Sequence, residues 1–341
     1  MKPKLPRRAA PVFAALATML AGCDVPMDTL RPQSNFARAI ASLYWEIIGW
    51  ETLILALVVG LIILVLVKHS TRRIGYTRIN PTHVNEHLLL EGAWTIGPAL
   101  ILLLIAFPAI VINFRSQPDH PPRHAFHVVV VGHQWWWEFR YPTLGIDTAN
   151  EAHIPVNQNI YFELHTDDVI HSFWVPKLGG KRDVIPNHTN ELILKPDKPG
   201  EYFGQCAEFC GLSHANMRMR IFVDTPEQFA RWIADETSSP RVPRPAEPHY
   251  REIARGMNIF EGSMCTTCHG ISGLSTGTIG PNLSHFGSRT TLAGATLPNT
   301  EQQLAEWIEH PDKLKPGAKM PALSLSPGQV TAVATYLESL R

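Results

Sequence analysis

The distribution of apolar residues changes twice along this 341-residue chain. Two long stretches with almost no charge come first, at about 45–67 and 88–114, and each is long enough to cross the ~30 Å hydrocarbon layer of a membrane as a helix. From about 125 to 224 the apolar runs are short, alternate with polar residues, and are broken by Pro, Gly and Asn. After about 249 the spacing becomes helical. The pattern therefore predicts a transmembrane hairpin, a β-rich domain and a small helical domain.

The two long apolar stretches have one alternative interpretation, a buried helical hairpin in a soluble protein. Their length and lack of charge favour the membrane instead. The connection between them carries Lys68, Arg72, Arg73 and Arg78, and the positive-inside rule places such a loop in the cytoplasm. Everything after Phe114 is then predicted to lie on the outer side of the membrane.

The middle region has strand-like segments at regular spacing, among them 127–131, 160–164, 191–194 and 220–223. About a hundred residues of such strands indicate a β-sandwich or a Greek-key barrel. The segment 229–236 predicts a short helix that closes this domain.

The C-terminal region is predicted to be small and all-α. Thr300 is placed to cap a helix that ends near Glu309, and Ser326 followed by Pro327 is placed to begin another. Prolines at 240, 243, 245 and 248 predict a stiff, extended linker before this region. The predicted domain boundaries are 1–22 for a signal peptide, 23–120 for the transmembrane hairpin, 121–237 for the β domain, 238–248 for the linker and 249–341 for the helical domain.

The first 23 residues have the form of a secretory signal, with a basic start and a short apolar run. Leu20-Ala21-Gly22-Cys23 resembles the lipobox of bacterial lipoproteins, in which the cysteine is acylated and becomes the new N-terminus. The alternative is an uncleaved signal with an incidental cysteine. We therefore predict lipidation at Cys23.

Charge and cysteine content narrow the range of possible functions. Lys plus Arg and Asp plus Glu both number 30, so the formal net charge is zero and gives no electrostatic reason to expect nucleic acid as a partner. Besides Cys23, the cysteines form two pairs, Cys206 with Cys210 and Cys265 with Cys268. If each group has its own role, no thiol remains for a disulfide framework.

The first cysteine pair lies in a segment rich in soft metal ligands, because Cys206, Cys210, His214 and Met217 fall within twelve residues. Two thiolates, an imidazole and a thioether suit copper. A mononuclear blue-copper loop uses a single cysteine, so the second cysteine indicates two metal ions bridged by two thiolates. A disulfide or a zinc site remains as an alternative, although neither explains the close register of the histidine and the methionine.

The second pair belongs to Cys265-Thr266-Thr267-Cys268-His269, the attachment motif of a c-type haem. Two thiols three residues apart can form thioethers to the haem vinyl groups, and the next histidine can ligate the iron. A chance occurrence or a zinc site is the alternative. The surrounding helix with Gly256 and Phe260 favours the haem.

Two segments of the sequence resemble the cytochrome oxidase subunit II family. The segment 204–217 is similar to that family's binuclear copper (CuA) loop, and 168–176 is similar to the strand that carries its other histidine ligand. The resemblance implies a cupredoxin-like β-barrel. It also implies Cys206 and Cys210 as bridging ligands, His171 and His214 as terminal ligands, and Met217 and the Glu208 carbonyl as weak axial ligands.

Three further roles follow from the resemblance alone. The Glu208 side chain is implied to reach a magnesium ion at the interface with subunit I. Trp135, in Gly132-His133-Gln134-Trp135-Trp136-Trp137, is implied as the point where electrons enter, although three tryptophans can also simply cover a barrel end. Glu91 falls where the family has a carboxylate near the mouth of a proton channel.

The region 249–341 resembles the small class I cytochromes c, with Gly280-Pro281-Asn282-Leu283 and Lys319-Met320-Pro321 following the attachment motif. That order implies Met320 as the sixth haem ligand. His285 and His310 are competing candidates, but their neighbours do not resemble the family's ligand loop. A histidine–methionine pair raises the reduction potential, as a donor to copper requires.

The order of domains is that of the caa3-type oxidases and implies a respiratory electron-transport subunit in a bacterial inner membrane, with both redox domains on the periplasmic side. Electrons would pass from haem c to CuA and into subunit I, where oxygen is reduced with proton translocation. The implied partners are subunits I and III, membrane lipid, and a soluble cytochrome c or another donor. The alternatives are a nitric oxide reductase subunit, a membrane-tethered electron-transfer module without a dedicated oxidase and, less favoured, a quinol oxidase subunit.

Overall fold

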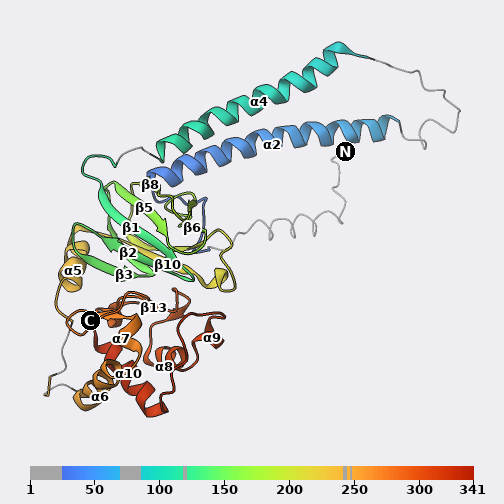
Figure 1. Ribbon diagram of the computed structural model, residues 1–341. Coiled ribbons are helices and arrows are strands. Elements are labelled where there is room, and N and C mark those ends of the chain that lie inside the picture. Colours follow the sequence, from blue (N-terminus) through green and yellow to red (C-terminus); the bar gives the residue numbers. More distant parts are fainter. Residues whose placement is uncertain (1–24, 70–85, 118–120, 241–243, 246–247) are drawn as a thin grey trace, which may run out of the picture.

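A computed structural model describes residues 25–69, 86–117, 121–240, 244–245 and 248–341. The predicted signal peptide with Cys23, and all of the basic connection except Lys68, lie outside the described residues. The described chain has three parts, a helical hairpin, a β domain and a C-terminal helical domain, which follow one another in space as in sequence (Figure 1).

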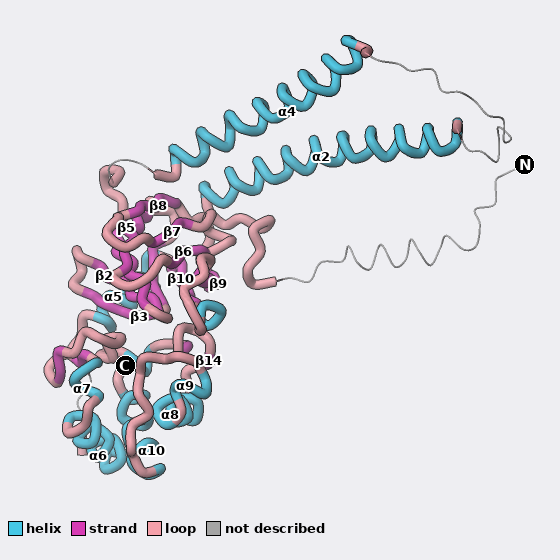
Figure 2. Tube along the Cα trace, turned by 45° about the vertical axis from the view of Figure 1, so that its right-hand side comes forward, coloured by secondary structure: helices cyan, strands magenta, loops and turns pink. Residues whose placement is uncertain are grey.

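The N-terminal part consists of helices α2 (Asn35–Lys68) and α4 (Leu88–Arg115), which run alongside each other and away from the β domain (Figures 1 and 2). In the most apolar 18-residue window of each helix no residue is buried. The alternative of a buried hairpin in a soluble protein is therefore not supported, since such helices would cover each other's apolar side chains. By length and composition, both helices are able to cross a membrane.

Helix α2 begins ten residues before the predicted span, because its first turns belong to the β domain. Ser34 caps the helix with its hydroxyl, which also donates a hydrogen bond to the Leu178 carbonyl at 2.5 Å. Ala37 and Ala41 are buried, and the ring of Phe36 lies so close to Gly179 that a Cβ there would be 2.8 Å from it. The membrane helix is thus joined to the β domain without a break.

The β domain is a sandwich of two five-stranded sheets, ordered β3-β2-β1-β5-β8 and β4-β10-β9-β6-β7. Neighbouring strands are antiparallel except for β1 with β5 and β4 with β10, which are parallel and give the crossed connections of a Greek-key, cupredoxin-like barrel. The strands are β1 (Phe126–His133), β2 (Trp136–Tyr141), β3 (Ile146–Ala149), β4 (Glu151–Pro155), β5 (Ile160–Thr166), β6 (His171–Trp174), β7 (Arg182–Val184), β8 (Asn190–Leu194), β9 (Gly200–Cys206) and β10 (Arg218–Asp224).

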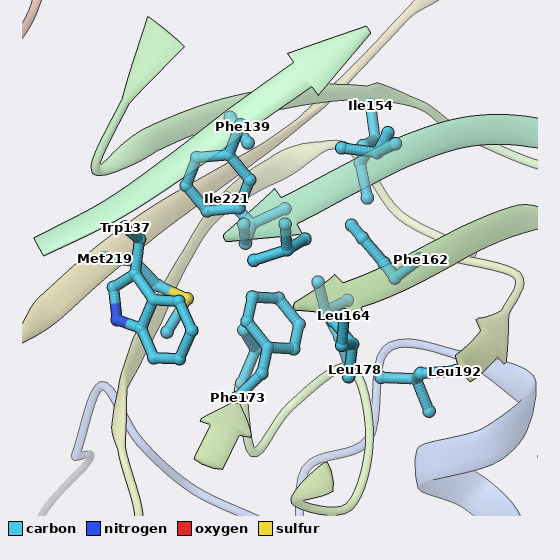
Figure 3. Close-up of a cluster of buried hydrophobic side chains, with 14 of the residues drawn as sticks. Trp137, Phe139, Ile154, Phe162, Leu164, Phe173, Leu178, Leu192, Met219 and Ile221 are labelled. Atoms are coloured by element: carbon cyan, nitrogen blue, oxygen red, sulfur yellow. The ribbon is translucent and has the colours of Figure 1, made fainter. Parts of the chain in front are cut away.

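The core of the sandwich consists of large apolar side chains from both sheets, which alternate with outward-facing residues along each strand (Figure 3). Trp137, Phe139 and Phe173 are almost fully buried and make edge-to-face ring contacts. Helix α5 (Pro226–Glu236) closes the domain and begins three residues earlier than predicted, because Thr225 and Gln228 form a capping box there.

The C-terminal domain packs its long helices around a separate apolar core. Gly256 on α6 lies directly against α10, where an added Cβ would meet the Ala332 carbonyl oxygen at 1.9 Å. The elements are α6 (Tyr250–Glu261), α7 (Cys265–Cys268), β11 (Gly270–Ile271), β12 (Ser275–Thr276), β13 (Thr291–Leu292), β14 (Leu297–Pro298), α8 (Glu301–Glu309), α9 (Pro311–Leu314) and α10 (Pro327–Ser339), with the short 3-10 turn η2 (Phe286–Ser288). The predicted caps at Thr300 and Ser326 are confirmed.

Candidate redox sites

The six predicted copper ligands gather at one end of the β-sandwich. Cys206 ends β9, and the loop that follows brings Cys210 back, so that the two sulfur atoms lie 3.8 Å apart. His171, the first residue of β6, has its Nδ1 atom 3.9 Å from the Cys206 sulfur. Among the described residues, these three side chains form a cluster that could hold a metal ion, and all three are buried.

The other three ligand atoms complete this cluster. His214 lies in the short 3-10 turn η1 (His214–Asn216), with its Nδ1 atom 3.5 Å from the Cys210 sulfur. The Met217 sulfur is 3.9 Å from the Cys210 sulfur, and the Glu208 carbonyl oxygen is 3.3 Å from the Cys206 sulfur. Two thiols flanked by two imidazoles, a thioether and a carbonyl form a donor set that fits copper.

Asp168 orients His171, the predicted ligand on β6. Its Oδ1 atom lies 2.8 Å from His171 Nε2, so that Nδ1 faces the cysteines. Burial raises the pKa of Asp168, but hydrogen bonds from His171 and from the backbone N–H groups of Val169 and Gln134 outweigh it and hold that pKa well below its usual range. The carboxylate is therefore ionised, and it fixes both the tautomer and the direction of the imidazole.

The hydrogen bond between the two thiols moves their pKa values in opposite directions. The hydrogen bond from Cys210 lowers the pKa of Cys206 to about 4. The same bond, together with burial and the charge of Cys206, raises the pKa of Cys210 well above its usual range. The protein alone thus favours one thiolate and one thiol, and a metal ion would have to displace the second proton.

Trp135 connects the copper cluster to the C-terminal domain. Its indole N–H donates to the Cys210 carbonyl oxygen at 2.9 Å, and its side chain is only 8% exposed. Its two neighbours have other positions: Trp136 stacks on His133 with ring centroids 4.3 Å apart, and Trp137 lies in the core of the sandwich. The three adjacent tryptophans are therefore not equivalent.

The predicted haem ligands line one cavity of about 280 Å³, which lies between the C-terminal domain and the β domain. Cys265, Cys268, His269 and Met320 contribute to its wall, and Trp135 contributes from the β domain. A cavity whose wall carries both attachment thiols and two iron-ligating side chains fits a c-type haem.

His269 is prepared to ligate iron through Nε2. Its Nδ1 atom is 2.8 Å from the Pro281 carbonyl oxygen, and Gly280 leaves room for the ring, since a Cβ there would be 2.7 Å from it. Burial lowers the pKa of His269, which favours the neutral, ligating form. The two competing candidates for sixth ligand are elsewhere: neither His285 nor His310 is part of the cavity wall, whereas Met320 is.

Glu91 and the side chain of Glu208 are not part of either cluster. Glu91 is in the first turn of α4, where its carboxylate accepts a hydrogen bond from the His87 backbone N–H at 3.1 Å. The Glu208 side chain is exposed, next to Phe209, which is 77% exposed. Their proposed roles in proton uptake and magnesium binding remain predictions.

Sequence reasoning assigned no role to Asp168, Glu151 or Lys315. Asp168 precedes His171 by three residues, and a carboxylate so close to a ligand histidine is a signal that could have been used. Glu151 and Lys315 are both buried, each 4% exposed, at the contact between the two redox domains. Nothing in their local sequence indicates that contact.

The fold and the two sites define a membrane-anchored redox protein with a cupredoxin-like metal domain and a c-type cytochrome domain. Three family models match the chain in the same order: "Cytochrome C oxidase subunit II, transmembrane domain" over residues 32–112, "Cytochrome C oxidase subunit II, periplasmic domain" over 143–224 and "Cytochrome c" over 253–341.

Whole-chain relatives agree with the family models. Cytochrome c oxidase subunit 2 of Bacillus sp. PS3 is 33% identical over 352 residues, covering 97% of this chain and 96% of that protein. The Bacillus subtilis protein is 32% identical over 354 residues with the same coverage, and that of Alkalihalophilus pseudofirmus is 36% identical over 293 residues, covering 84% and 83%. The chain belongs to the cytochrome c oxidase subunit 2 family.

These findings confirm the main functional prediction. The chain is a membrane protein that combines a subunit II copper domain with a cytochrome c domain, and the two domains imply copper and haem c as cofactors. They do not support a nitric oxide reductase subunit or a module without an oxidase. Quinol oxidase subunit 2 of Bacillus cereus is also similar, at 28% identity over 252 residues, which cover 71% of this chain and 83% of that protein.

Proposed function

We propose that this chain takes electrons into a haem c held by residues 249–341 and passes them to a binuclear CuA centre in the β domain. From there they enter subunit I of a haem–copper oxidase, where oxygen is reduced to water and protons are pumped. The observation that carries the proposal is Trp135, which lines the haem cavity and donates a hydrogen bond to the backbone of the copper ligand Cys210.

The copper centre would use Cys206 and Cys210 as thiolate bridges, with His171 and His214 at the two ends and the Met217 sulfur and Glu208 carbonyl as weak axial ligands. A bridged copper pair shares one unpaired electron and changes little in geometry when reduced. The chain contributes the arrangement of these atoms, since Asp168 directs His171 and the β-sandwich positions both strand-borne ligands. Burial of the cluster keeps water away from it.

The haem would be attached through Cys265 and Cys268 and ligated by His269 and Met320. When bound, it supplies a one-electron iron centre whose potential is raised by the methionine. The Pro281 carbonyl holds the His269 ring through Nδ1, and Gly280 leaves the ring the space to turn toward the cavity. The wall of the cavity is mostly apolar, and it would shield the iron from solvent.

The remaining expectations concern location and partners. We expect both redox domains on the periplasmic side of the inner membrane, with an acylated Cys23 as a third anchor. The resemblance implies a contact with subunit I at Glu208, whose exposed carboxylate would be available to a magnesium ion at that interface. Glu91 would serve proton uptake, subunit III would complete the complex, and a soluble cytochrome c would reduce the haem.

The copper assignment is tested in the purified oxidase by electron paramagnetic resonance. We expect two copper ions per chain in this domain and one unpaired electron coupled to both nuclei. A Cys210→Ser variant should lose that mixed-valent signal, because one thiolate cannot bridge as two do, while the covalent haem stain stays unchanged. One copper per chain with an ordinary blue-copper spectrum would contradict the binuclear assignment.

A further inference from the structure

Glu151 is a buried carboxylate that neither redox site uses. It is the first residue of β4 and is only 4% exposed. Its oxygens accept hydrogen bonds from the backbone N–H of Thr290 at 3.0 and 3.1 Å, from that of Thr291 at 2.7 Å, and from both threonine hydroxyls. Burying a carboxylate without hydrogen-bond donors is very unfavourable, so these N–H and hydroxyl groups make a specific contact with Glu151. All of the donors belong to the haem domain.

A second set of contacts lies around Trp135. Lys315, from the loop before Met320, donates through Nζ to the Trp135 carbonyl and, at 2.9 Å, to the Ala293 carbonyl. The fully buried hydroxyl of Ser213, in the copper loop, donates to the Pro316 carbonyl at 2.7 Å. The loop that carries a predicted haem ligand is thus bonded to Trp135 through Lys315 and to the loop of predicted copper ligands through Ser213.

Two glycines let these loops touch the Trp135 ring itself. A Cβ at Gly317, in the haem domain, would lie 2.9 Å from Trp135 Cη2, and one at Gly211, in the copper loop, would lie 3.0 Å from Cζ2. Both have positive φ angles, +78° and +114°, which favour glycine. The indole ring is therefore enclosed by the backbones of the two redox loops.

We propose that Glu151 and Gly317 are positioning residues that hold the haem domain in one fixed place over Trp135 and so close Trp135 to any separate electron donor. The proline-rich linker by itself suggests a tethered donor that must find its partner, at an effective concentration on the order of millimolar. The contact between the haem domain and the β domain instead keeps the two in a permanent complex, so the donor does not have to diffuse to its acceptor. The inference rests on the proposed function, since it concerns the transfer of one electron that oxidises ferrous haem to ferric and reduces the copper centre.

The first test compares Glu151→Gln with the intact chain in the assembled oxidase. One electron is injected into the haem by a photoactivated ruthenium reagent, and haem oxidation with copper reduction is followed in time. We expect transfer to be roughly tenfold slower in the variant, because small displacements of positioned groups have large kinetic effects. Its rate should also become dependent on ionic strength, as for an encounter between separate surfaces.

The matched control is Glu191→Gln, which removes a carboxylate from β8, in the other sheet and away from this contact. It should transfer electrons at the rate of the intact chain. The copper signal and the covalent haem stain should be unchanged in both variants, which separates a positioning effect from a folding defect.

Gly317→Ala has an unusually close control in Gly273→Ala. The φ angles of the two glycines are +78° and +79°, so both substitutions impose the same backbone strain, but a Cβ at Gly273 meets no atom within 4 Å. We expect slower transfer only in Gly317→Ala. The haem potential is measured in both, so that rates are compared at equal driving force and a change at Met320 is not mistaken for displacement.

Mixing with a reduced soluble cytochrome c tests the closure of Trp135. In the intact oxidase we expect the haem of this chain to be reduced before the copper, whereas copper reduction with the haem still oxidised would overturn the closure. Equal, salt-independent transfer in Glu151→Gln and the intact chain would overturn the positioning role. Absence of haem-to-copper transfer in the intact chain would instead contradict the proposed function itself.

Discussion

In the copper domain all six predicted ligands already lie within 4 Å of a neighbouring ligand atom, whereas in the haem domain the four predicted ligands surround a cavity of about 280 Å³. The copper cluster sits at the end of a sandwich that has a complete core of its own, from Val128 to Val223. The haem cavity instead borders directly on the helical core, and Met320 packs against that core from its edge.

Copper and haem would therefore depend on the protein fold in different ways. A copper pair would add bonds to side chains that the sheets already hold, so the metal depends on the fold. A haem would fill space that no side chain fills, so it would add to the stability of the C-terminal domain. The consequence is that loss of each cofactor should have unequal effects on the two domains.

The largest expected effect is that of removing haem attachment. At roughly 24 cal/mol per Å³, leaving a cavity of this size unfilled costs at most about 7 kcal/mol, which is comparable to the whole stability of a small domain. A Cys265→Ala, Cys268→Ala double variant should therefore be cleaved by limited proteolysis within 249–341, while 121–237 resists. Chelating the copper from the intact chain is the matching control and should leave both domains resistant.

The sixth ligand gives the next effect. Met320→Ala should keep the covalent haem stain but lower the reduction potential and open the iron to carbon monoxide, because the thioether would be lost from the iron. His285→Ala should do neither, since His285 is not part of the cavity wall. Carbon monoxide difference spectra of the two variants decide between Met320 and His285. Carbon monoxide binding by the His285 variant would show that His285, and not Met320, ligates the iron.

A smaller effect is expected at Asp168, which acts on the copper site only through His171. Asp168→Asn should weaken copper binding by roughly 10- to 100-fold, as is typical when the partner of a ligating imidazole is changed. Copper affinity is measured by competition with a chelator. Asp167→Asn, one residue earlier, is the control, and equal weakening in both would point to a general charge effect.

The smallest effect is expected at Lys319, whose Nζ lies 3.5 Å from Asp168 Oδ2 across the domain contact. Its side chain is 62% exposed, and exposed ion pairs contribute at most about 1 kcal/mol. Lys319→Gln should therefore change copper affinity by less than about fivefold, and the difference should disappear at high salt. A larger change that persists at high salt would mean that the haem domain controls the copper ligands through Asp168.

Local chemistry could be predicted from the sequence because it depends on residues close together in the chain. The cysteine pairs, the attachment motif, the helix caps at Thr300 and Ser326 and the two long apolar spans each occupy a single short segment. Strand-like alternation likewise indicated a sandwich or barrel, and the structure has two five-stranded sheets. The start of α2 was missed because Phe36 and Ile40 lie against Gly179 and Gly180, about 140 positions later, which no local pattern reports.

By itself, then, the sequence determined the order of the domains, the cofactor classes and the residues that would hold them, since ligand types and their spacing are properties of short segments. Only the tertiary structure decided how the two redox domains meet. The contact depends on Glu151 accepting hydrogen bonds from two threonines 139 and 140 residues away, and on two glycines that let their loops approach the Trp135 ring closely. Such a match is a property of two folded surfaces, because neither surface exists until its own domain has formed.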